Sequence, residues 1–361
     1  MRLNKLSAVG VAAATCLLVG TAAVAQQLVL PPPSTLTTTV VGQFNVQSLE
    51  LNAKCQAAGD PLCNPSGPYP VQSSPGQIAD YLLILQGGST GLNYPSPLGP
   101  GLTGDNAFEP PSGAVSSTFV MSAANEPTPT FTGDRIGTWE VQLSSLLKYL
   151  TQPSGQVADL VFLFDNNQQG AGVNQFQYAW ATASIRDAAG NVVAGQCYGL
   201  FSGTGYGGGN CANPTPVAPT FNADGSLNLI NDYVALATDF CVNKAAPYDS
   251  YKVGLAGNAG DCAPDAGHPA GGYFVSNNLG QNNAEFAAYN TSLQAYFLAH
   301  ATENLTLSVN IRLANLNDGN EQVWICSACG LNRLILIPEP GSLALVGLAL
   351  AGLGVARRRR S

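Results

Sequence analysis

The chain has few charged residues and few of the residue types on which many catalytic sites depend. Of its 361 residues, 10% are charged and two are histidines, whereas roughly 25% of the residues in typical soluble domains are charged. The low charge does not indicate a membrane bundle, because no interior apolar run is long enough to cross a bilayer. Gly, Asn, Gln, Ser and Thr supply the polarity instead, which is typical of proteins outside the cell.

The common catalytic and nucleotide-binding motifs are also absent. His268, in a Gly-His-Pro loop, and His300, at the end of an apolar segment, suffice in number for a Ser-His-Asp triad, but the chain has no G-x-S-x-G elbow. It also lacks H-E-x-x-H, a P-loop and a Rossmann glycine fingerprint. A glycosidase that uses two carboxylates remains an alternative, because a sequence does not give the distance between two acids. We therefore expect no enzyme, and a secreted glycoside hydrolase is the least favoured alternative.

The first 25 residues are typical of a secretory signal peptide. Arg2 and Lys5 form a positive start, a long apolar segment follows, and Ala23 and Ala25 supply the A-x-A cleavage pattern. The mature chain is therefore expected to begin at Gln26.

The mature body is strongly acidic. Without residues 1–25 and 341–361, 8 basic residues face 22 acidic ones, a net charge of −14. Such a surface repels the phosphates of nucleic acids and anionic lipids. We expect no nucleic-acid partner, whereas divalent cations and basic partners would be tolerated.

Eight of the nine cysteines remain once Cys16 of the leader is removed, an even number that suits an oxidising compartment. Their spacing favours four local disulfides: Cys55 with Cys63, Cys197 with Cys211, Cys241 with Cys262, and Cys326 with Cys329. The last pair is a C-x-x-C that could instead be redox-active or half of a zinc site. Both alternatives are disfavoured, because no second pair has matching spacing and the motif follows a strand-like run.

The body, residues 26–336, is predicted to be all-β. Short β-branched or alternating runs are separated by Gly, Pro and Asn turns, which favours an antiparallel, jelly-roll-like β-sandwich in one large or two small domains. One or two short helices are expected, at residues 143–150 and 293–300, where apolar residues recur at helical spacing.

Two hairpins are the clearest local predictions. Residues 176–185 turn at Asp187 to Asn191 into residues 192–201, and residues 305–313 turn at 317–320 into residues 321–326. Residues 35–46 are expected to form the first strand, and residues 52–77 a loop.

A calcium- or carbohydrate-binding module is the main alternative function. Hard oxygen ligands of the kind that calcium prefers cluster at two predicted strand ends. They are Asp165, Asn167, Asp318 and Glu321. Neither run has EF-hand spacing, and Asn and Asp also suit tight turns, so the turn interpretation is favoured and no other cofactor is expected. Trp139 and Trp180 are candidate surface aromatics for sugar binding.

The last 25 residues combine three features in a fixed order. Pro338, Glu339 and Pro340 come first, then an apolar helix is expected at 342–356, then a basic cluster. That cluster consists of Arg357, Arg358, Arg359 and Arg360. The apolar segment would be about 22 Å long as a helix, short of the roughly 20 residues that usually span a bilayer. The arginines are expected to stay in the cytoplasm.

This arrangement resembles a PEP-CTERM sorting signal over residues 337–361. The resemblance implies a Gram-negative, exopolysaccharide-producing bacterium, in whose inner membrane an exosortase, a cysteine transpeptidase-like enzyme, recognises the tail and removes it near Pro-Glu-Pro. Tails of this type also carry the label of an ice-binding protein C-terminal domain. That label does not imply ice binding here, because the single cluster of Thr37, Thr38 and Thr39 is not repeated.

The predicted function is therefore that of an exported, non-enzymatic surface or extracellular-matrix protein. Its expected partners are the secretion machinery, an exosortase and extracellular polysaccharide, and its precursor is expected to be anchored in the inner membrane.

Overall fold

The computed structural model of the protein describes about half of the body and neither chain end. The described residues are 28–30, 37–60, 81–86, 119–120, 138–152, 154–165, 177–201, 211, 216–223, 227–236, 239–243, 250–252, 262, 272–276, 284–315, 322–327 and 329–331. The predicted signal peptide, with Ala23 and Ala25, and the whole sorting tail lie outside them.

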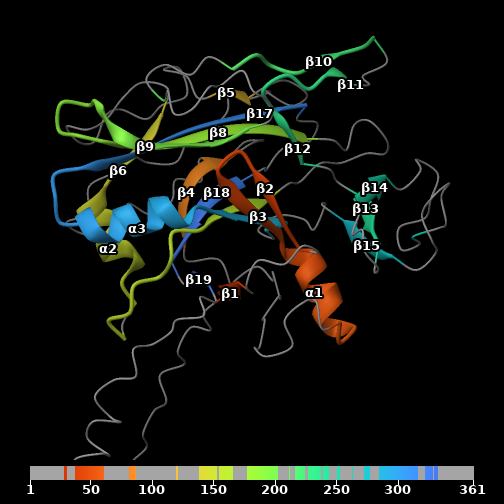
Figure 1. Ribbon diagram of the computed structural model, residues 1–361, viewed down its shortest axis with the longest axis horizontal. Coiled ribbons are helices and arrows are strands. Elements are labelled where there is room, and N and C mark those ends of the chain that lie inside the picture. The colour runs from red at the N-terminus through yellow and green to blue at the C-terminus, as the bar shows by residue number, and fades with distance from the viewer. Residues whose placement is uncertain are drawn as a thin grey trace, which may run out of the picture.

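Two six-stranded sheets dominate the described residues (Figure 1). Sheet I has the strand order β2 (Thr38–Val41), β3 (Phe44–Ser48), β16 (Phe286–Tyr289), β7 (Phe162–Asp165), β18 (Gln322–Cys326) and β4 (Tyr81–Gln86). Sheet II contains β12 (Val234–Leu236), β8 (Gln177–Arg186), β17 (Thr306–Ala314) and β5 (Phe119–Val120), with β9 (Val192–Leu200) on β8 and β6 (Trp139–Gln142) on β17. All pairs within both sheets are antiparallel.

The remaining described elements are smaller. The strands are the parallel pair β1 (Leu28–Leu30) and β19 (Cys329–Leu331), the pair β10 (Thr220–Phe221) and β11 (Leu227–Leu229), and a three-stranded sheet of β14 (Ser250–Lys252), β13 (Asp239–Val242) and β15 (Tyr273–Ser276). The helices are α1 (Leu49–Ala57), α2 (Leu143–Leu150) and α3 (Thr291–His300). The prediction of a mostly antiparallel β-protein with short helices is confirmed at this level.

Both large sheets contribute to one apolar core because of the period-2 alternation of their strands. In β17, Leu307, Val309, Ile311 and Leu313 are buried and belong to the same cluster as the phenylalanines of sheet I. The apolar faces of α2 and α3 join this cluster at one side. Complete burial of each Leu or Phe side chain contributes about 1.5–3 kcal/mol.

A second cluster lies on the other face of sheet I. Leu163 of β7 and Trp324 of β18 point away from the main core and pack with Leu30 of β1. Cys326 and Cys329 belong to the same cluster. Figure 1 accordingly shows β1 and β19 on the side of sheet I that faces away from β8 and β17. This cluster fixes the last described strand to the body.

Several local predictions are confirmed. The hairpin of β8 and β9 forms, with Gly190 of its turn at a φ of +82°. Helix α2 covers residues 143–150 as predicted, and α3 starts two residues earlier than expected, at Thr291. Asn290 caps α3, since its side chain accepts a 2.8 Å hydrogen bond from the Leu293 N–H.

The second predicted hairpin is wrong. Strand β17 lies in sheet II, whereas β18 lies in sheet I and pairs with β7 and β4. The reason is that both edges of β17 are already occupied, by β8 along its whole length and by β6 and β5 on the other side. The chain therefore crosses to the other sheet instead of folding back on itself.

Two predictions near the N-terminus are also wrong. The expected strand at residues 35–46 is split into β2 and β3 by a turn at Gly42, which has a φ of +58°. Residues 52–57, expected in a loop, belong to α1. That helix is stabilised by the Ser48 cap on Leu51 and by the ion pair between Glu50 and Lys54 at 2.6 Å.

Within the described ranges, no helix is long and apolar enough to cross a membrane. The apolar segment 342–356, for which a helix was expected, lies outside those ranges.

Candidate functional site

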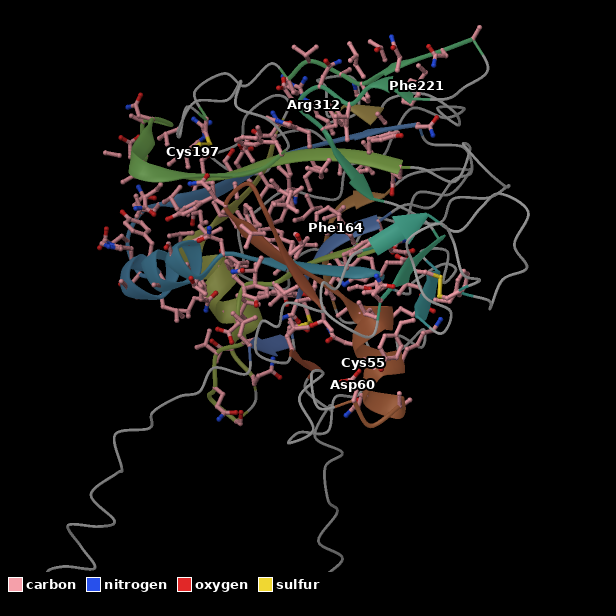
Figure 2. The ribbon with its side chains drawn as sticks, turned by 45° about the vertical axis from the view of Figure 1, so that its right-hand side comes forward. Cys55, Asp60, Phe164, Cys197, Phe221 and Arg312 are labelled. Carbon is pink, nitrogen blue, oxygen red and sulfur yellow. A yellow bond between two sulfur atoms is a disulfide. The ribbon has the colours of Figure 1, made fainter. Side chains whose placement is uncertain are left out.

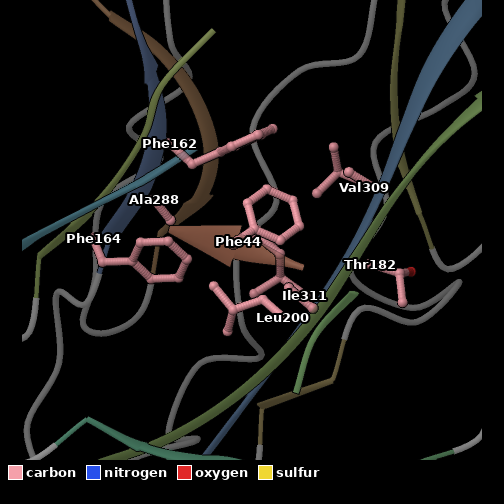
Figure 3. Close-up of a pocket in the computed structure, with 10 residues that line it drawn as sticks. Phe44, Phe162, Phe164, Thr182, Leu200, Ala288, Val309 and Ile311 are labelled. Carbon is pink, nitrogen blue, oxygen red and sulfur yellow. The ribbon is translucent and has the colours of Figure 1, made fainter. Parts of the chain in front are cut away.

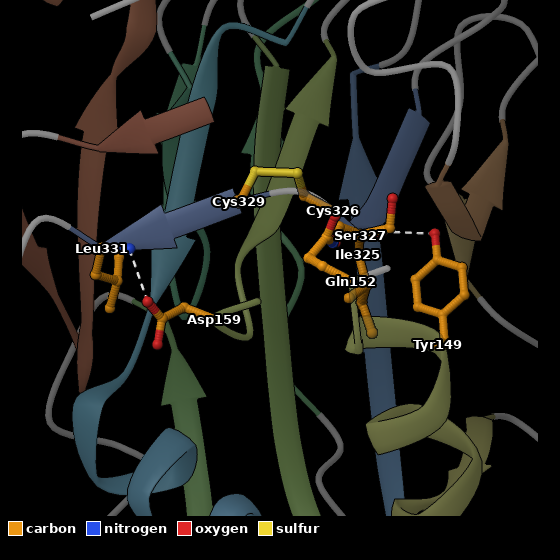
Figure 4. The surroundings of a disulfide bond; sticks show 8 residues. All are labelled: Tyr149, Gln152, Asp159, Ile325, Cys326, Ser327, Cys329 and Leu331. Carbon is orange, nitrogen blue, oxygen red and sulfur yellow. Dashed lines mark hydrogen bonds between the residues drawn. A yellow bond between two sulfur atoms is a disulfide. The ribbon is translucent and has the colours of Figure 1, made fainter. Parts of the chain in front are cut away.

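The candidate site is the region that immediately precedes the predicted sorting tail in the chain. We call it the stem base and define it as Asp159, Cys326, Ser327, Cys329 and Leu331. Helix α2 ends at Leu150, and a turn with Gly155 at a φ of +83° sends the chain back toward Asp159. The returning segment lies beside the end of β18 and beside β19, and Figure 4 shows this arrangement.

Asp159 holds β19 at two points. Its backbone N–H donates to the Cys329 carbonyl at 2.8 Å. Its Oδ2 accepts a 2.7 Å hydrogen bond from the Leu331 N–H, which is the dashed line beside Asp159 in Figure 4. The second bond joins a side-chain oxygen of the returning segment to the backbone of β19. Asp159 therefore fixes the last described residue of the chain to the body.

The chain just before β19 is held in the same way. The Cys326 N–H donates to the Val161 carbonyl at 3.2 Å, and the side-chain amide of Gln152 donates to the Ser327 carbonyl. The Tyr149 hydroxyl donates to the Ile325 carbonyl at 3.4 Å. The disulfide between Cys326 and Cys329 closes the turn, and both cysteines are buried.

The other cysteines also pair locally. Cys197 is bonded to Cys211 and Cys241 to Cys262, which are the partners that the spacing predicts. Cys55 is also disulfide-bonded, while its predicted partner, Cys63, lies outside the described residues. The C-x-x-C pair is a buried disulfide that follows β18, so its surroundings differ from those of a reactive cysteine at a helix N-terminus.

A small cavity lies between the two large sheets (Figure 3). Its volume of about 20 Å³ leaves room for roughly one water molecule. Phe44, Phe162 and Phe164 line it from sheet I, and Leu200, Val309 and Ile311 from sheet II. Among the described lining residues there is no acid, histidine or cysteine, and Thr182 carries the one hydroxyl.

The predicted calcium ligands are placed only in part. Asp165, at the end of β7, is 1% exposed and lies opposite Gln322 of β18. Asn167, Asp318 and Glu321 lie outside the described residues, so their part of the prediction stays a prediction. Among the residues that the structure covers, no three His, Cys, Asp or Glu side chains form a group that could hold a metal ion.

The interpretation of Trp139 and Trp180 as surface aromatics is wrong. Both side chains are fully buried. Trp139 points into the main core because it alternates with the outward-facing Glu140 on β6. Trp180 lies on the opposite face of sheet II, under the guanidinium of Arg312, whose carbon is 5.5 Å from the ring centre. Figure 2 labels Arg312, near the top of the view. Neither ring is available to stack on a sugar in this structure.

Sequence reasoning did not identify a buried polar row on the outer face of sheet II. Glu140 is fully buried, and its Oε1 accepts hydrogen bonds from the hydroxyls of Thr138 and Ser308, the latter at 2.7 Å. Ser308 lies opposite Glu140 on one side and opposite Ser184 on the other. The polar residues that alternate along β17 predict that one face of this strand is polar. They do not predict that this face is buried or that Glu140 lies opposite Ser308.

His300 contacts two side chains near the end of α3. Its Nδ1 is 2.7 Å from Oε1 of Glu303, and its ring stacks on Tyr296 with the centres 4.1 Å apart. These contacts lie at the exposed end of α3, without a serine among them. His268 lies outside the described residues.

Comparison with known protein families adds to this geometry. Residues 336–360 match the PEP-CTERM protein-sorting motif. The tail therefore implies an exported protein that is anchored in the membrane before an exosortase processes it. Residues 28–312 match a domain of unknown function, DUF8239, and because this match covers more than half of the chain, the protein belongs to that family. No curated protein and no solved structure matches the chain.

The two matches leave a gap that contains most of the stem base. The body match ends at Arg312 in β17, and the motif match begins at Leu336. Strands β18 and β19 and the disulfide between Cys326 and Cys329 lie between these limits.

Proposed function

We propose that this protein is a non-enzymatic component of the cell surface or extracellular matrix, whose β-rich body is displayed after an exosortase has removed the tail. The observation that carries the proposal is the PEP-CTERM motif at residues 336–360. The signal peptide expected at residues 1–25 would deliver the body to the outer side of the inner membrane, and the arginines of the tail would stay inside.

The proposed body is a jelly-roll-like β-sandwich. Support comes from the inner faces of the two six-stranded sheets, whose residues share one buried cluster. The buried disulfides suit the same role, because each restricts the unfolded chain and contributes about 2–4 kcal/mol in an oxidising compartment. Such a body would persist outside the cell without chaperones.

Two observations support a role without catalysis. The cavity between the sheets has an apolar lining and is too small for a substrate. The acids Glu140 and Asp165 are almost completely buried in strands of different sheets. Incubation of the mature body with a panel of chromogenic glycosides should give no turnover above that of the heat-denatured protein.

The proposed sorting is tested by fractionating cells with and without the exosortase gene. The protein should move to the surface or matrix fraction only in cells that have the enzyme, and it should accumulate in the inner membrane in cells that lack it. Replacing Pro338, Glu339 and Pro340 with alanine should reproduce the loss in cells that have the enzyme. Asp187→Ala, in an exposed turn of the body, is the control and should sort normally. An unchanged distribution without the exosortase would contradict the proposal.

A further inference from the structure

The stem base lies very close to the sorting motif. Six residues, 332–337, separate Leu331 from Pro338. A fully extended chain gains at most about 3.3–3.6 Å per residue, so this connection spans no more than about 25 Å. The folded body must therefore lie against the membrane, or against the enzyme, when the motif is at the active site.

Strand β19 is attached by a short strand pairing, by the buried cluster that contains Cys329 and by the stem base. Its described strand partner is β1, with which it forms a two-stranded parallel sheet over three residues. A two-stranded sheet is at best marginally stable by itself. The two hydrogen bonds to Asp159 and the disulfide to Cys326 supply additional attachment.

Release of this strand would lengthen the connection. The disulfide keeps Cys329 beside Cys326, so opening would free residues 330 and 331, and the free segment before Pro338 would grow from six residues to eight. The two extra residues would add about 7 Å of reach. Proteins open locally with free energies that range from near zero up to that of global unfolding.

We propose that the exosortase acts on the opened form, in which β19 has left β1 and Asp159, and that the stem base therefore controls the rate of tail removal. This inference rests on the proposed function, because it assumes that an exosortase processes the tail. When opening and closing are fast relative to cleavage, the cleavage rate follows the equilibrium population of the open form. Any change that weakens the stem base should then accelerate processing.

The test measures tail removal by pulse-chase labelling of the full-length protein in cells with the exosortase. Asp159→Ala should accelerate removal about fivefold, the change in population that follows the loss of one ordinary hydrogen bond. The double variant Cys326→Ser with Cys329→Ser should also accelerate it. Insertion of five Gly and Ser residues after Leu331 should do the same without altering the stem base.

Each variant has a matched control. Asp187→Ala also removes a carboxylate that accepts backbone N–H groups, those of Ala189 and Asn191, but it lies in the turn between β8 and β9. Cys197→Ser with Cys211→Ser removes a different local disulfide. Both controls should be processed at the wild-type rate. In the protein with the inserted residues, Asp159→Ala should have no further effect.

The outcomes separate this inference from the proposed function. Tail removal that continues without the exosortase would overturn the proposed function. If removal needs the exosortase but Asp159→Ala and the insertion are processed no faster than the wild type, the stem base does not control the rate and this inference is wrong. If Asp159→Ala does not fold or is not exported, the insertion alone decides.

Discussion

Gly42 lies directly against the backbone of Gly199, and this contact joins the two large sheets. A β-carbon on Gly42 would stand well under 3.0 Å from the carbonyl oxygen of Gly199. The same carbonyl accepts a 2.8 Å hydrogen bond from the Gln43 N–H, and the Gly199 N–H donates to Oε1 of Gln43 at 2.8 Å. The turn between β2 and β3 of sheet I is therefore attached to β9 of sheet II.

Gly42→Ala should destabilise the body by about 3–5 kcal/mol, because it combines a left-handed backbone with a collision against backbone atoms. Gly195→Ala is the matched control, since Gly195 has a φ of +75° but open space around the position of a β-carbon. It should cost only the conformational penalty of about 1–2 kcal/mol. Urea unfolding of the two variants measures the difference, and equal losses would contradict the close contact.

Ser308→Ala should cost about 1–3 kcal/mol, because it removes a hydroxyl donor from the buried carboxylate of Glu140. Ser184, equally buried and directly opposite on β8, is the control because its hydroxyl has no carboxylate partner among the described residues. Ser184→Ala should cost less than about 1 kcal/mol. Chemical unfolding at pH 7 compares the two, and a larger loss for Ser184→Ala would exclude the assigned hydrogen bond.

Alkaline pH should destabilise the body through Tyr233. Burial raises the pKa of this phenol to about 12, even though the nearby charge of Arg312 opposes the shift. The unfolded value is about 10, so the neutral phenol favours the folded state below pH 10 and this contribution is lost as the pH rises from about 10 to 12. Tyr233→Phe should therefore lose less stability between pH 9 and pH 11 than the wild type. Urea midpoints at the two pH values measure this, and parallel losses would contradict the assignment.

The parts of the fold that depend on neighbouring residues were predictable. The turn from Asp187 to Asn191 sets the hairpin of β8 and β9, because Gly190 adopts a positive φ and the Asp187 carboxylate accepts the N–H groups of Ala189 and Asn191. Helix α2 was predictable because its leucines recur at helical spacing. Helix α1 was missed, although the spacing of Glu50 and Lys54 was a usable signal.

The parts that depend on distant partners were not predictable. The alternation in β17 indicates a strand with one apolar face, but it does not say that β8 and β6 take both edges and exclude β18. The pairing of β1 with β19 likewise places Leu28 beside Cys329, two residues that are far apart in the sequence. The burial of Trp139 and Trp180 has the same origin, since it depends on what packs against each face of sheet II. The sorting motif, in contrast, is short and contiguous, so the sequence alone was enough to predict it.

The most direct test of the whole account is the intact mass of the protein recovered from cells with and without the exosortase. With the enzyme, the mass should correspond to a chain that begins at Gln26, ends close to Pro338-Glu339-Pro340 and contains its disulfides. Without the enzyme, the chain should still begin at Gln26 but extend to Ser361. Equal masses in the two strains, or a chain that keeps residues 1–25, would contradict the account.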